Sequence, residues 1–452
     1  MELSIIAGDV NCSVAQPRNH LHALAIIRNV CRARPNGYQF MPRYRKGMWD
    51  GYISLMQGFS KFPTGLLPLV EKTLLEAGYN LTISAHIPED AQYTIEDDCL
   101  NGITLRDYQI EAAQALLQAR RGVAKMATNA GKTEVMAAII KQLHVRTMVL
   151  VHRKELLYQT AQRFEHRLGI RVGKIGDGIQ DVQGVTVAMV QTLSKRMHEI
   201  DLSDIGLVMV DECHHMSSDQ HMDCLQHIPG AYRFGFSGTP LKYDQLNDLK
   251  LIAATGDIVY EVTNKNLIEN QYSAKPKICL CEMIDLERKS WKQKYSSAYE
   301  DLIVNNSRRN RKIAKFAKEA TGTVLVLVNR LDHGEKLASM IVGSQFVHGS
   351  DTTDTRQNIL DEMRSGAGGV YVASPIFDEG VDVPALDCVI LAGGGKSHIK
   401  LLQRLGRGMR KKDRNNVLLV YDFVDNTNRY LYNHSLARIA TYEEEEFEVQ
   451  RI

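Results

Sequence analysis

The sequence predicts an α/β protein in which two tandem doubly wound parallel-sheet lobes follow a small α+β N-terminal domain. Its 452 residues are enough for about three domains of ordinary size. From about residue 100 onward, short apolar runs rich in β-branched residues alternate with helical patterns, as the buried strands of parallel sheets do. This alternation stops at a polar, basic stretch and then restarts. We therefore expect domains at residues 1–95, 96–275 and 276–452.

The composition narrows the class of protein. Hydrophobic residues make up 44% of the chain and charged residues 24%, which argues against wholesale disorder or a coiled coil. No apolar run approaches the roughly 18 residues needed to span a bilayer, so no membrane partner is expected. The first residues lack the basic region of a signal peptide, which predicts a cytoplasmic protein. The eight cysteines are scattered and fit reduced thiols, and the net charge of +2 neither supports nor excludes a nucleic-acid partner.

The elements of the first lobe follow in chain order. Arg106 to Ala119 has helical spacing, and a second helical pattern runs from Glu134 to Gln142. Four apolar runs predict buried strands, at residues 122–125, 147–152, 184–189 and 205–210.

The second lobe is preceded by a lysine- and arginine-rich segment, Glu282 to Lys318, which predicts helix and contains no hydrophobic strand. The apolar runs then resume and predict strands at residues 323–328, 369–373, 388–392 and 417–422. The first 95 residues are poor in long strands, which favours a separate small domain.

A phosphate-binding loop is predicted after the first strand of the first lobe, because a tight loop there leads directly into a helical pattern. A strand, a loop and a helix N-terminus together present backbone amides and a positive dipole to phosphates. Lys132 is expected to reach the β- and γ-phosphates of ATP, and Thr133 to bind Mg²⁺. Met126 departs from the usual motif, because it stands where a glycine is common. The loop reads Met126-Ala127-Thr128-Asn129-Ala130-Gly131-Lys132-Thr133.

An acidic pair, Asp211 and Glu212, follows the strand at residues 205–210. The carboxyl ends of strands in a doubly wound sheet are where ligands bind. Asp211 is expected to hold Mg²⁺ through water, and Glu212 to accept a proton from the attacking water. Such a pair can also cap a helix, but the phosphate loop upstream favours the catalytic interpretation.

These two motifs resemble those of superfamily 2 helicases and translocases of the DExH kind, and further motifs follow in the family's order. The segment Leu105 to Gln109 is similar to the adenine-binding element, which implies that Arg106 and Gln109 bind the nucleotide. The resemblance also implies ATP contacts by the loop residues Thr128, Asn129, Ala130 and Gly131. It implies nucleic-acid contacts in the first lobe by Arg153, Lys154, Gln191 and Thr192. Ser237 and Thr239 resemble the residues that couple hydrolysis to movement.

The second lobe carries three more motifs of this family. Asn329 and Arg330 resemble the nucleic-acid contacts of motif IV, and Gly380 and Asp382 resemble the nucleotide-binding residues of motif V. The segment Gln403 to Arg410 resembles motif VI, which implies catalytic roles for Gln403, Arg407 and Arg410. The resemblance thus implies two RecA-like lobes that hydrolyse ATP with Mg²⁺. An arginine finger contributes on the order of 10³–10⁵ in rate, so hydrolysis would depend on closure of the lobes.

The N-terminal region interleaves aromatic and basic side chains between Tyr38 and Tyr52. Arg43, Arg45 and Lys46 can neutralise phosphates, and Trp49 can stack on a base, although the aromatic residues can equally form a small core. Gly47 and the Asp50-Gly51 step predict tight turns and hence short strands. The region is similar to the N-terminal domain of UvsW-type phage helicases.

Three other patterns resemble metal-binding, nucleotide-binding or cysteine sites but are better explained in other ways. Six cysteines and histidines between Cys213 and His227 suggest zinc, but the first three belong to the acidic motif and the rest have helical spacing. Gly394-Gly395-Lys396-Ser397 imitates a second phosphate loop without its outer glycine, and is better explained as the turn before the motif VI helix. Cys279 and Cys281 are expected to share one face of a strand as packing residues.

The leading hypothesis is an ATP-dependent DNA helicase or translocase that remodels branched DNA in phage recombination, replication and repair. UvsW-type enzymes migrate branches, reverse forks and unwind R-loops. The expected partners are branched, duplex or single-stranded DNA and the RNA of R-loops, and we expect a monomer in the host cytoplasm. The alternatives are an RNA helicase, the motor subunit of a restriction system, and a non-catalytic nucleic-acid-binding protein. No nuclease pattern supports the restriction subunit, and the intact catalytic set argues against the non-catalytic protein.

Overall fold

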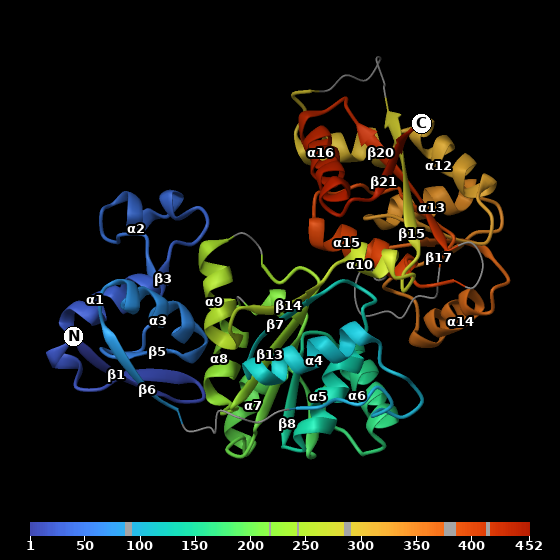
Figure 1. Ribbon diagram of the computed structural model, residues 1–452. Coiled ribbons are helices and arrows are strands. Elements are labelled where there is room, and N and C mark those ends of the chain that lie inside the picture. Colours follow the sequence, from blue (N-terminus) through green and yellow to red (C-terminus); the bar gives the residue numbers. More distant parts are fainter. Residues whose placement is uncertain (86–92, 217, 242–243, 284–290, 375–385, 413–415) are drawn as a thin grey trace. The chain divides into compact units, whose positions relative to one another are not determined.

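Three larger sheets organise the chain in the computed structural model (Figure 1). The structure describes residues 1–85, 93–216, 218–241, 244–283, 291–374, 386–412 and 416–452. One compact unit comprises Met1–Met126 and Ala130–Val262, and the second comprises Ala127–Asn129 and Thr263–Ile452. The longer segment of the second unit thus starts upstream of the predicted boundary at residue 276. The reason is the helix α10 (Asn264–Glu269), where Ile268 packs on the core of the second unit and Asn264 donates to Glu445.

The N-terminal domain has its own mixed sheet, ordered β5-β2-β1-β6 in the described residues. Its two longest strands, β1 and β6, are each six residues long. Apolar residues alternate along β1, with Leu3 and Ile5 buried against two helices. Its strands and helices are β1 (Glu2–Ala7), β2 (Asn11–Val14), α1 (Leu21–Val30), β5 (Lys61–Pro63), α3 (Leu67–Glu76) and β6 (Asn80–Ala85).

This domain shares its core with a helix of the first lobe. Ala253 of α9 (Gln245–Thr255) belongs to the hydrophobic cluster of the N-terminal domain, and Leu249 and Ile252 pack against it. The contact is close, because a Cβ added at Gly65 would lie 2.0 Å from the carbonyl oxygen of Ile252. The predicted division near residue 95 therefore separates two sheets that share one compact unit.

The aromatic and basic segment of the N-terminal domain is an excursion between the paired strands β3 (Arg32–Ala33) and β4 (Ile53–Ser54). Its tip is the single-turn helix α2 (Pro42–Arg45). The predicted tight turns are confirmed, since Gly47 and Gly51 have φ angles of 67° and 86°. The strands are short, as predicted, but the basic residues lie on and beside a helical turn.

The first lobe is a doubly wound sheet ordered β10-β9-β11-β8-β12-β13-β7-β14 in the described residues. Every pairing in it is parallel except that of β9 with β10. All four predicted strands and both predicted helices are confirmed. The strands are β7 (Arg121–Met126), β8 (Thr147–Val151), β9 (Gly173–Gly176), β10 (Ile179–Asp181), β11 (Val185–Met189), β12 (Leu207–Asp211), β13 (Tyr232–Ser237) and β14 (Ile258–Val262). The helices besides α9 are α4 (Asp107–Ala119), α5 (Lys132–Leu143), α6 (Lys154–Leu168), α7 (Val190–Arg196) and α8 (Asp219–His227).

The second lobe is a parallel sheet ordered β17-β18-β16-β19-β20-β15-β21 in the described residues. The four predicted strands are confirmed, and Cys279 and Cys281 lie buried on alternate positions of β15, as expected. The strands are β15 (Lys275–Met283), β16 (Thr323–Leu327), β17 (Gln345–Val347), β18 (Gly369–Ala373), β19 (Cys388–Leu391), β20 (Val417–Asp425) and β21 (Glu448–Arg451). The helices are α11 (Tyr295–Tyr299), α12 (Ser307–Glu319), α13 (Leu331–Met340), α14 (Thr353–Arg364), α15 (His398–Gly408) and α16 (Arg429–Glu444).

The two faces of this second sheet explain its continuous apolar strands. Along β16, Leu325 and Leu327 pack into one hydrophobic cluster, while Val324 and Val326 pack into another. A strand covered on both faces has no position left for a polar side chain. The described residues contain no helix long and apolar enough to cross a membrane.

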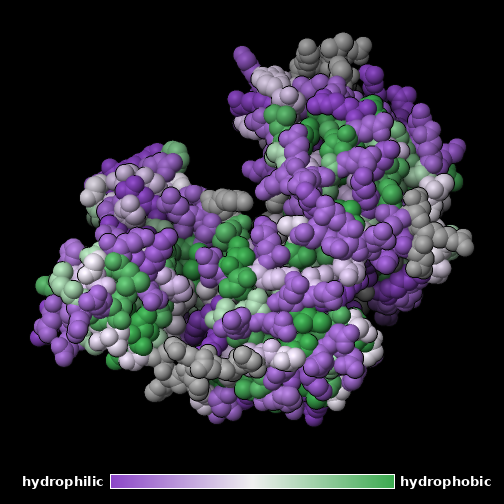
Figure 2. Space-filling view, viewed as in Figure 1, coloured by the Kyte–Doolittle hydropathy of each residue, from purple (hydrophilic) through white to green (hydrophobic). Residues whose placement is uncertain are grey.

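The described part of the basic segment is largely helical, as predicted, from Tyr295 to Val304 and from Ser307 to Glu319, whereas Glu282 belongs to β15 and residues 284–290 lie outside the described part. Along α12, Ile313 and Ala317 are buried, as are the polar residues Arg309 and Asn310. The remaining lysines and arginines lie on the outer side, where Figure 2 shows hydrophilic residues. Buried positions three and four residues apart are typical of an amphipathic helix.

Candidate active site

The predicted phosphate loop lies between β7 and α5, with Lys132 as the first residue of the helix. Gly131 has a φ of 78°, and a Cβ there would lie 2.2 Å from Nε2 of Gln109. Asn129 also adopts a positive φ, of 75°. The loop is thus a tight turn that ends at a helix N-terminus, the arrangement in which backbone amides bind phosphate.

Met126 shows why the motif tolerates a residue other than glycine at its start. It is the last residue of β7, and its side chain is fully buried. The backbone is still extended at this point, so a side chain can point into the core without narrowing the loop.

Gln109 supports this loop from the preceding helix. Its Nε2 donates to the carbonyl oxygen of Ala130 at 3.0 Å, and its Oε1 accepts from the backbone amide of Arg106 at 3.0 Å. Gln109 is 3% exposed, and Arg106 also donates to the hydroxyl of Tyr108. In this structure the amide of Gln109 therefore holds the phosphate loop, and base recognition by Arg106 and Gln109 stays a prediction.

Lys132 and the acidic pair meet at the carboxyl end of the sheet. Nζ of Lys132 lies 2.9 Å from Oε1 of Glu212, and both side chains are largely buried. Burial opposes ionisation of Glu212, but Lys132 and His214 outweigh it and hold its pKa well below the usual range. Burial and the charge of Glu212 raise the pKa of Asp211. The site thus contains two adjacent, half-buried carboxyl groups with one ammonium group.

His214 and Ser237 complete the surroundings of Glu212. Nδ1 of His214 lies 3.2 Å from Oε2 of Glu212 and 3.0 Å from Oγ of Ser237. Ser237 itself approaches Oε2 of Glu212 at 3.5 Å and accepts from the amide of Thr239 at 3.2 Å. The predicted coupling residues are thereby connected directly to the predicted base. His214 had no assigned role from the sequence, and its position two residues after Glu212 was the available signal.

The donors present fit Mg²⁺, which prefers carboxylate and hydroxyl oxygens. Asp211 and the half-buried Thr133 are the residues that would hold the ion. A cation beside the carboxylate of Asp211 would offset the burial and the repulsion that raise its pKa. When bound, Mg²⁺ would neutralise charge on the phosphates.

The predicted nucleic-acid residues of the first lobe lie at the starts of two helices. Arg153 is the N-cap residue of α6, and Nζ of Lys154 pairs with Asp177 at 2.8 Å. Gln191 donates to the carbonyl oxygen of His152 at 3.1 Å, and Thr192 is half-buried beside it in α7. The structure thus places these residues at the ends of β8 and β11, which are neighbouring strands.

The predicted nucleic-acid residues of the second lobe, Asn329 and Arg330, both bind other side chains or backbone groups of their own lobe. Nδ2 of Asn329 donates to the carbonyl oxygens of Gly393 and Gly394, while its Oδ1 accepts from Arg404. The side-chain amide of Asn329 thus organises a loop of its own lobe, which the sequence did not indicate. Arg330 is exposed and pairs with Asp332 at 2.7 Å.

The motif VI residues lie at the end of α15. Gln403 and Arg407 belong to the helix, and Arg410 follows the C-cap residue Met409 and is half-buried. The side chain of Arg407 lies outside the described part, as do the whole residues Gly380 and Asp382 of motif V. The finger and nucleotide roles of these residues stay predictions.

The basic residues of the N-terminal domain are exposed, while its tryptophan is half-buried. Arg43, Arg45 and Lys46 lie on and directly after α2. Nε1 of Trp49 donates to the carbonyl oxygen of Tyr52 at 2.7 Å. Trp49 therefore has a structural bond inside the excursion, and the three cations form its exposed surface.

The residues that suggested zinc are used in other ways. His214 contacts Glu212 and Ser237, and Cys224 donates weakly to the carbonyl oxygen of Val190. His221 pairs with Ser218, and His227 with the backbone of Asp223. The described residues contain no group of three side chains placed to hold a metal ion.

Known proteins resemble this chain throughout its length. Residues 102–242 match the family described as the res subunit of type III restriction enzymes, residues 307–412 the conserved C-terminal domain of helicases, and residues 19–84 the N-terminal domain of the DNA helicase UvsW. The DNA 3'-5' translocase XPB2 of Sulfurisphaera tokodaii is 31% identical over 358 residues, which cover 70% of this chain and 81% of that protein. The chain belongs to the superfamily 2 helicases.

Two further similarities cover most of this helicase. The ATP-dependent DNA helicase UvsW of phage T4 is 27% identical over 471 residues, or 93% of each chain. Yeast (S. cerevisiae) Dbp5 bound to RNA and ADP-BeF3 has the same fold, with a TM-score of 0.53 and 17% identity over 78% of this chain and 90% of its own. The protein is therefore an ATP-dependent helicase with RecA-like lobes and a UvsW-type N-terminal domain, as predicted.

Proposed function

We propose that this helicase uses the energy of ATP hydrolysis to move on branched DNA and to remodel it, by branch migration, fork reversal and R-loop unwinding. The single observation that carries the proposal is the similarity to UvsW along 93% of both chains, which includes the N-terminal domain as well as the two lobes. The matching N-terminal domain supports a function specific to that group.

The geometry of the first lobe supports ATP hydrolysis with a proton acceptor. Glu212 is a carboxylate at neutral pH, because Lys132 and His214 hold its pKa low despite burial. A carboxylate stabilised this strongly is a weak base. When a phosphate of ATP draws Lys132 away, Glu212 loses its nearest cation, and its basicity rises as the attacking water arrives. The ion pair between Lys132 and Glu212 would thus restrain the base until the substrate is bound.

The contacts of Glu212 also supply a route from hydrolysis to movement. Ser237 and His214 both contact the carboxylate, and Ser237 in turn receives the amide of Thr239. Any change in the charge or position of Glu212 alters these bonds. We infer that this connection transmits the state of the nucleotide to the end of β13.

The exposed cations after Met41 support a DNA-binding role for the N-terminal domain. Arg43, Arg45 and Lys46 can each neutralise a phosphate, and Trp49 braces the excursion that carries them. We further propose that Mg²⁺ assists ATP hydrolysis, that R-loop RNA is also a substrate, and that the protein acts as a monomer in the cytoplasm of an infected cell.

The test compares ATP turnover in the presence of single-stranded DNA, duplex, a fork, a four-way junction and single-stranded RNA at equal nucleotide concentration. We expect junctions and forks to stimulate turnover most, and the enzyme to convert a four-way junction into two duplexes. Equal stimulation by unbranched DNA, or a preference for RNA, would contradict the proposal.

A further inference from the structure

A pocket of about 590 Å³ lies in the second lobe beside Asn329, at the carboxyl ends of β16 and β19. It is lined by four cationic side chains and, among the described residues, by no carboxylate. The cations are Lys396, Lys400, Arg404 and Arg438. Pockets of this size take small ligands, and an excess of cations favours an anion.

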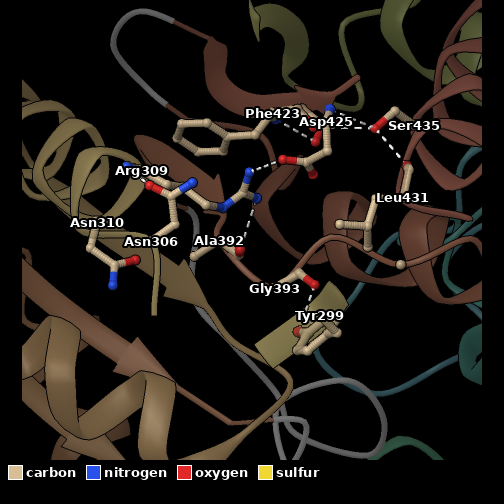
Figure 3. A network of polar contacts seen from close by, with 12 residues as sticks. Tyr299, Asn306, Arg309, Asn310, Ala392, Gly393, Phe423, Asp425, Leu431 and Ser435 are labelled. Carbon is tan, nitrogen blue, oxygen red and sulfur yellow. Dashed lines mark hydrogen bonds and ion pairs between the residues drawn. The ribbon is translucent and has the colours of Figure 1, made fainter. Parts of the chain in front are cut away.

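Side chains of other elements donate hydrogen bonds to the carbonyl oxygens of the loop at the rim of the pocket, residues 392–396. Arg309 donates to the carbonyl of Ala392 at 3.0 Å, and Tyr299 to that of Gly393 at 2.8 Å, as Figure 3 shows. The amide of Asn329 reaches the carbonyls of Gly393 and Gly394, and Arg438 that of Gly395 at 2.7 Å. Four successive carbonyl groups are therefore fixed by side chains of other elements. This loop is the sequence that imitates a second phosphate loop.

Backbone N–H groups of this loop are available to bind a ligand. Among the described residues, no acceptor is found for the backbone N–H groups of Gly394, Gly395 and Lys396, although these residues line the pocket. Gly394 and Gly395 have φ angles of 60° and 121°, which favour glycine. Successive free amides beside cations are typical of anion sites.

The four cations at the pocket differ in their burial and in their hydrogen-bond and ion-pair partners. Arg438 is buried and paired with Asp422, and Arg404 is buried and donates to Asn329. In contrast, the exposed Lys396 and Lys400 have no ion-pair partner among the described residues. Burial, with smaller effects of the charges of Lys396 and Arg438, lowers the pKa of His434 on the pocket wall. An anion would relieve this repulsion.

Aromatic rings form another part of the wall. Tyr295 and Tyr430 lie edge to face, with ring centroids 6.3 Å apart, and His434 lies 5.2 Å from Tyr295. Tyr295 is 40% exposed, which leaves apolar ring surface at the mouth of a charged pocket. A ligand with both a phosphate and an aromatic base would match the cations and the rings together.

We propose that this pocket binds one nucleotide of the nucleic-acid strand, with its phosphate at Lys396, Lys400 and the loop amides and its base against Tyr430. The proposal rests on the proposed function, since it supplies a contact by which the second lobe holds the strand. The loop glycines permit the close approach of a phosphate, and the four held carbonyls keep the site in place when the strand pulls on it.

The first experiment measures binding of a fluorescent oligothymidylate to the full chain without ATP, over a range of salt concentrations. The test variant is Lys396→Ala/Lys400→Ala, and the matched control is Lys315→Ala/Lys318→Ala, which removes two exposed lysines from α12. Loss of the one phosphate contact that the two lysines share should lower the log-log salt slope for a single strand by about 0.7. We expect this change, with weaker binding, in the test variant alone, and DNA-independent ATP turnover unchanged.

The second experiment tests the base with a Tyr430→Leu variant and a Tyr430→Phe control. The wild-type protein and the Phe control should bind an abasic oligonucleotide about five- to tenfold more weakly than a normal one. In Tyr430→Leu this difference should shrink towards one. Thymidine monophosphate and inorganic phosphate serve as competitors, and we expect neither to displace the strand at millimolar concentration.

Three outcomes would overturn the proposal. Unchanged affinity and salt slope in the double lysine variant would remove the pocket from strand binding, and an unchanged abasic difference in Tyr430→Leu would remove the base contact. Displacement by thymidine monophosphate would instead assign the pocket to a free nucleotide. A wild-type protein that binds no oligonucleotide at all would contradict the proposed function itself, which separates the two failures.

Discussion

At the scale of single residues, Glu212 is the group on which the site depends. It adopts a left-handed backbone conformation with a φ of 49°, and its two carboxylate oxygens are divided between Lys132 on one side and His214 with Ser237 on the other. A non-glycine residue in this conformation costs free energy, which the surrounding contacts must offset. The position of the Glu212 carboxylate, the predicted base, is therefore set by its partners.

Replacing Lys132 and replacing Glu212 should have different effects on nucleotide affinity and ATP turnover. Lys132→Ala removes a phosphate contact, so both ATP turnover and nucleotide affinity should fall. Glu212→Gln keeps the other ATP-binding residues, so turnover should be abolished while ATP still binds. Nucleotide binding measured by equilibrium titration, beside turnover, distinguishes them. Equal loss of nucleotide binding in both variants would contradict these roles.

The arginines of motif VI carry the second prediction at this scale. Arg407→Ala and Arg410→Ala should each slow hydrolysis by orders of magnitude, because their charge is needed only at the γ-phosphate in the transition state. DNA binding without nucleotide should stay nearly intact, as measured by anisotropy. A turnover within about threefold of wild type would remove that residue from the finger role.

At the scale of elements, the helices α12 and α13 are joined by a buried histidine. His333 of α13 is fully buried, and its Nε2 lies 3.0 Å from Oδ1 of Asn310 on α12. Burial, with a smaller effect of Arg309, lowers the pKa of His333 to about 3. The folded protein therefore keeps this histidine neutral, and the packing of the two helices depends on that neutral form.

This histidine predicts a pH dependence of stability. Between pH 6.5 and 3 the unfolded chain binds a proton at His333 and the folded chain does not, so the free energy of unfolding falls as the pH is lowered. The loss from this group is about 2 kcal/mol between pH 7 and pH 5. Denaturant unfolding at several pH values should show that the free energy of unfolding varies less steeply with pH in His333→Gln than in the wild type. This variant keeps a donor for Asn310. Identical slopes in the two proteins would refute the assignment.

At the scale of the whole molecule, the N-terminal domain and the first lobe are joined by a glycine contact. A Cβ at Gly65 would lie 2.0 Å from the carbonyl oxygen of Ile252 and 2.6 Å from that of Ala253, and neither backbone oxygen can turn aside. Gly65→Ala should therefore separate the domain from α9, at a cost of about 1–3 kcal/mol. Hydrogen exchange along α9 should accelerate. Gly184→Ala is the control, because nothing lies within 4 Å of its Cβ.

The DNA grip of that domain is the second prediction at this scale. The triple variant Arg43→Ala, Arg45→Ala, Lys46→Ala removes exposed charges and should fold normally. Its affinity for a four-way junction should fall, and the log-log salt slope should drop by up to about 2.7 if all three contact duplex phosphates. Single-strand-stimulated ATP turnover should persist, because the lobes are unchanged. A folded variant with wild-type junction affinity and salt slope would exclude this segment as the grip.

The sequence by itself determined the architecture of the two lobes and the family. Buried parallel strands must be apolar throughout, so every strand predicted in the lobes is present, and a phosphate loop needs Gly131 and Lys132 next to a helix start. Local rules of this kind act over a few residues and are therefore visible in the chain.

Only the tertiary structure decided which side chains meet. The sequence could not show that Gln109 holds the phosphate loop, that His214 connects Ser237 to Glu212, or that Asn329 is turned to the loop at Gly393. Nor could it show that α10 belongs to the second unit or that α9 completes the core of the N-terminal domain. These contacts join residues far apart in the chain. Their geometry depends on sheet order and helix packing, which no local pattern specifies.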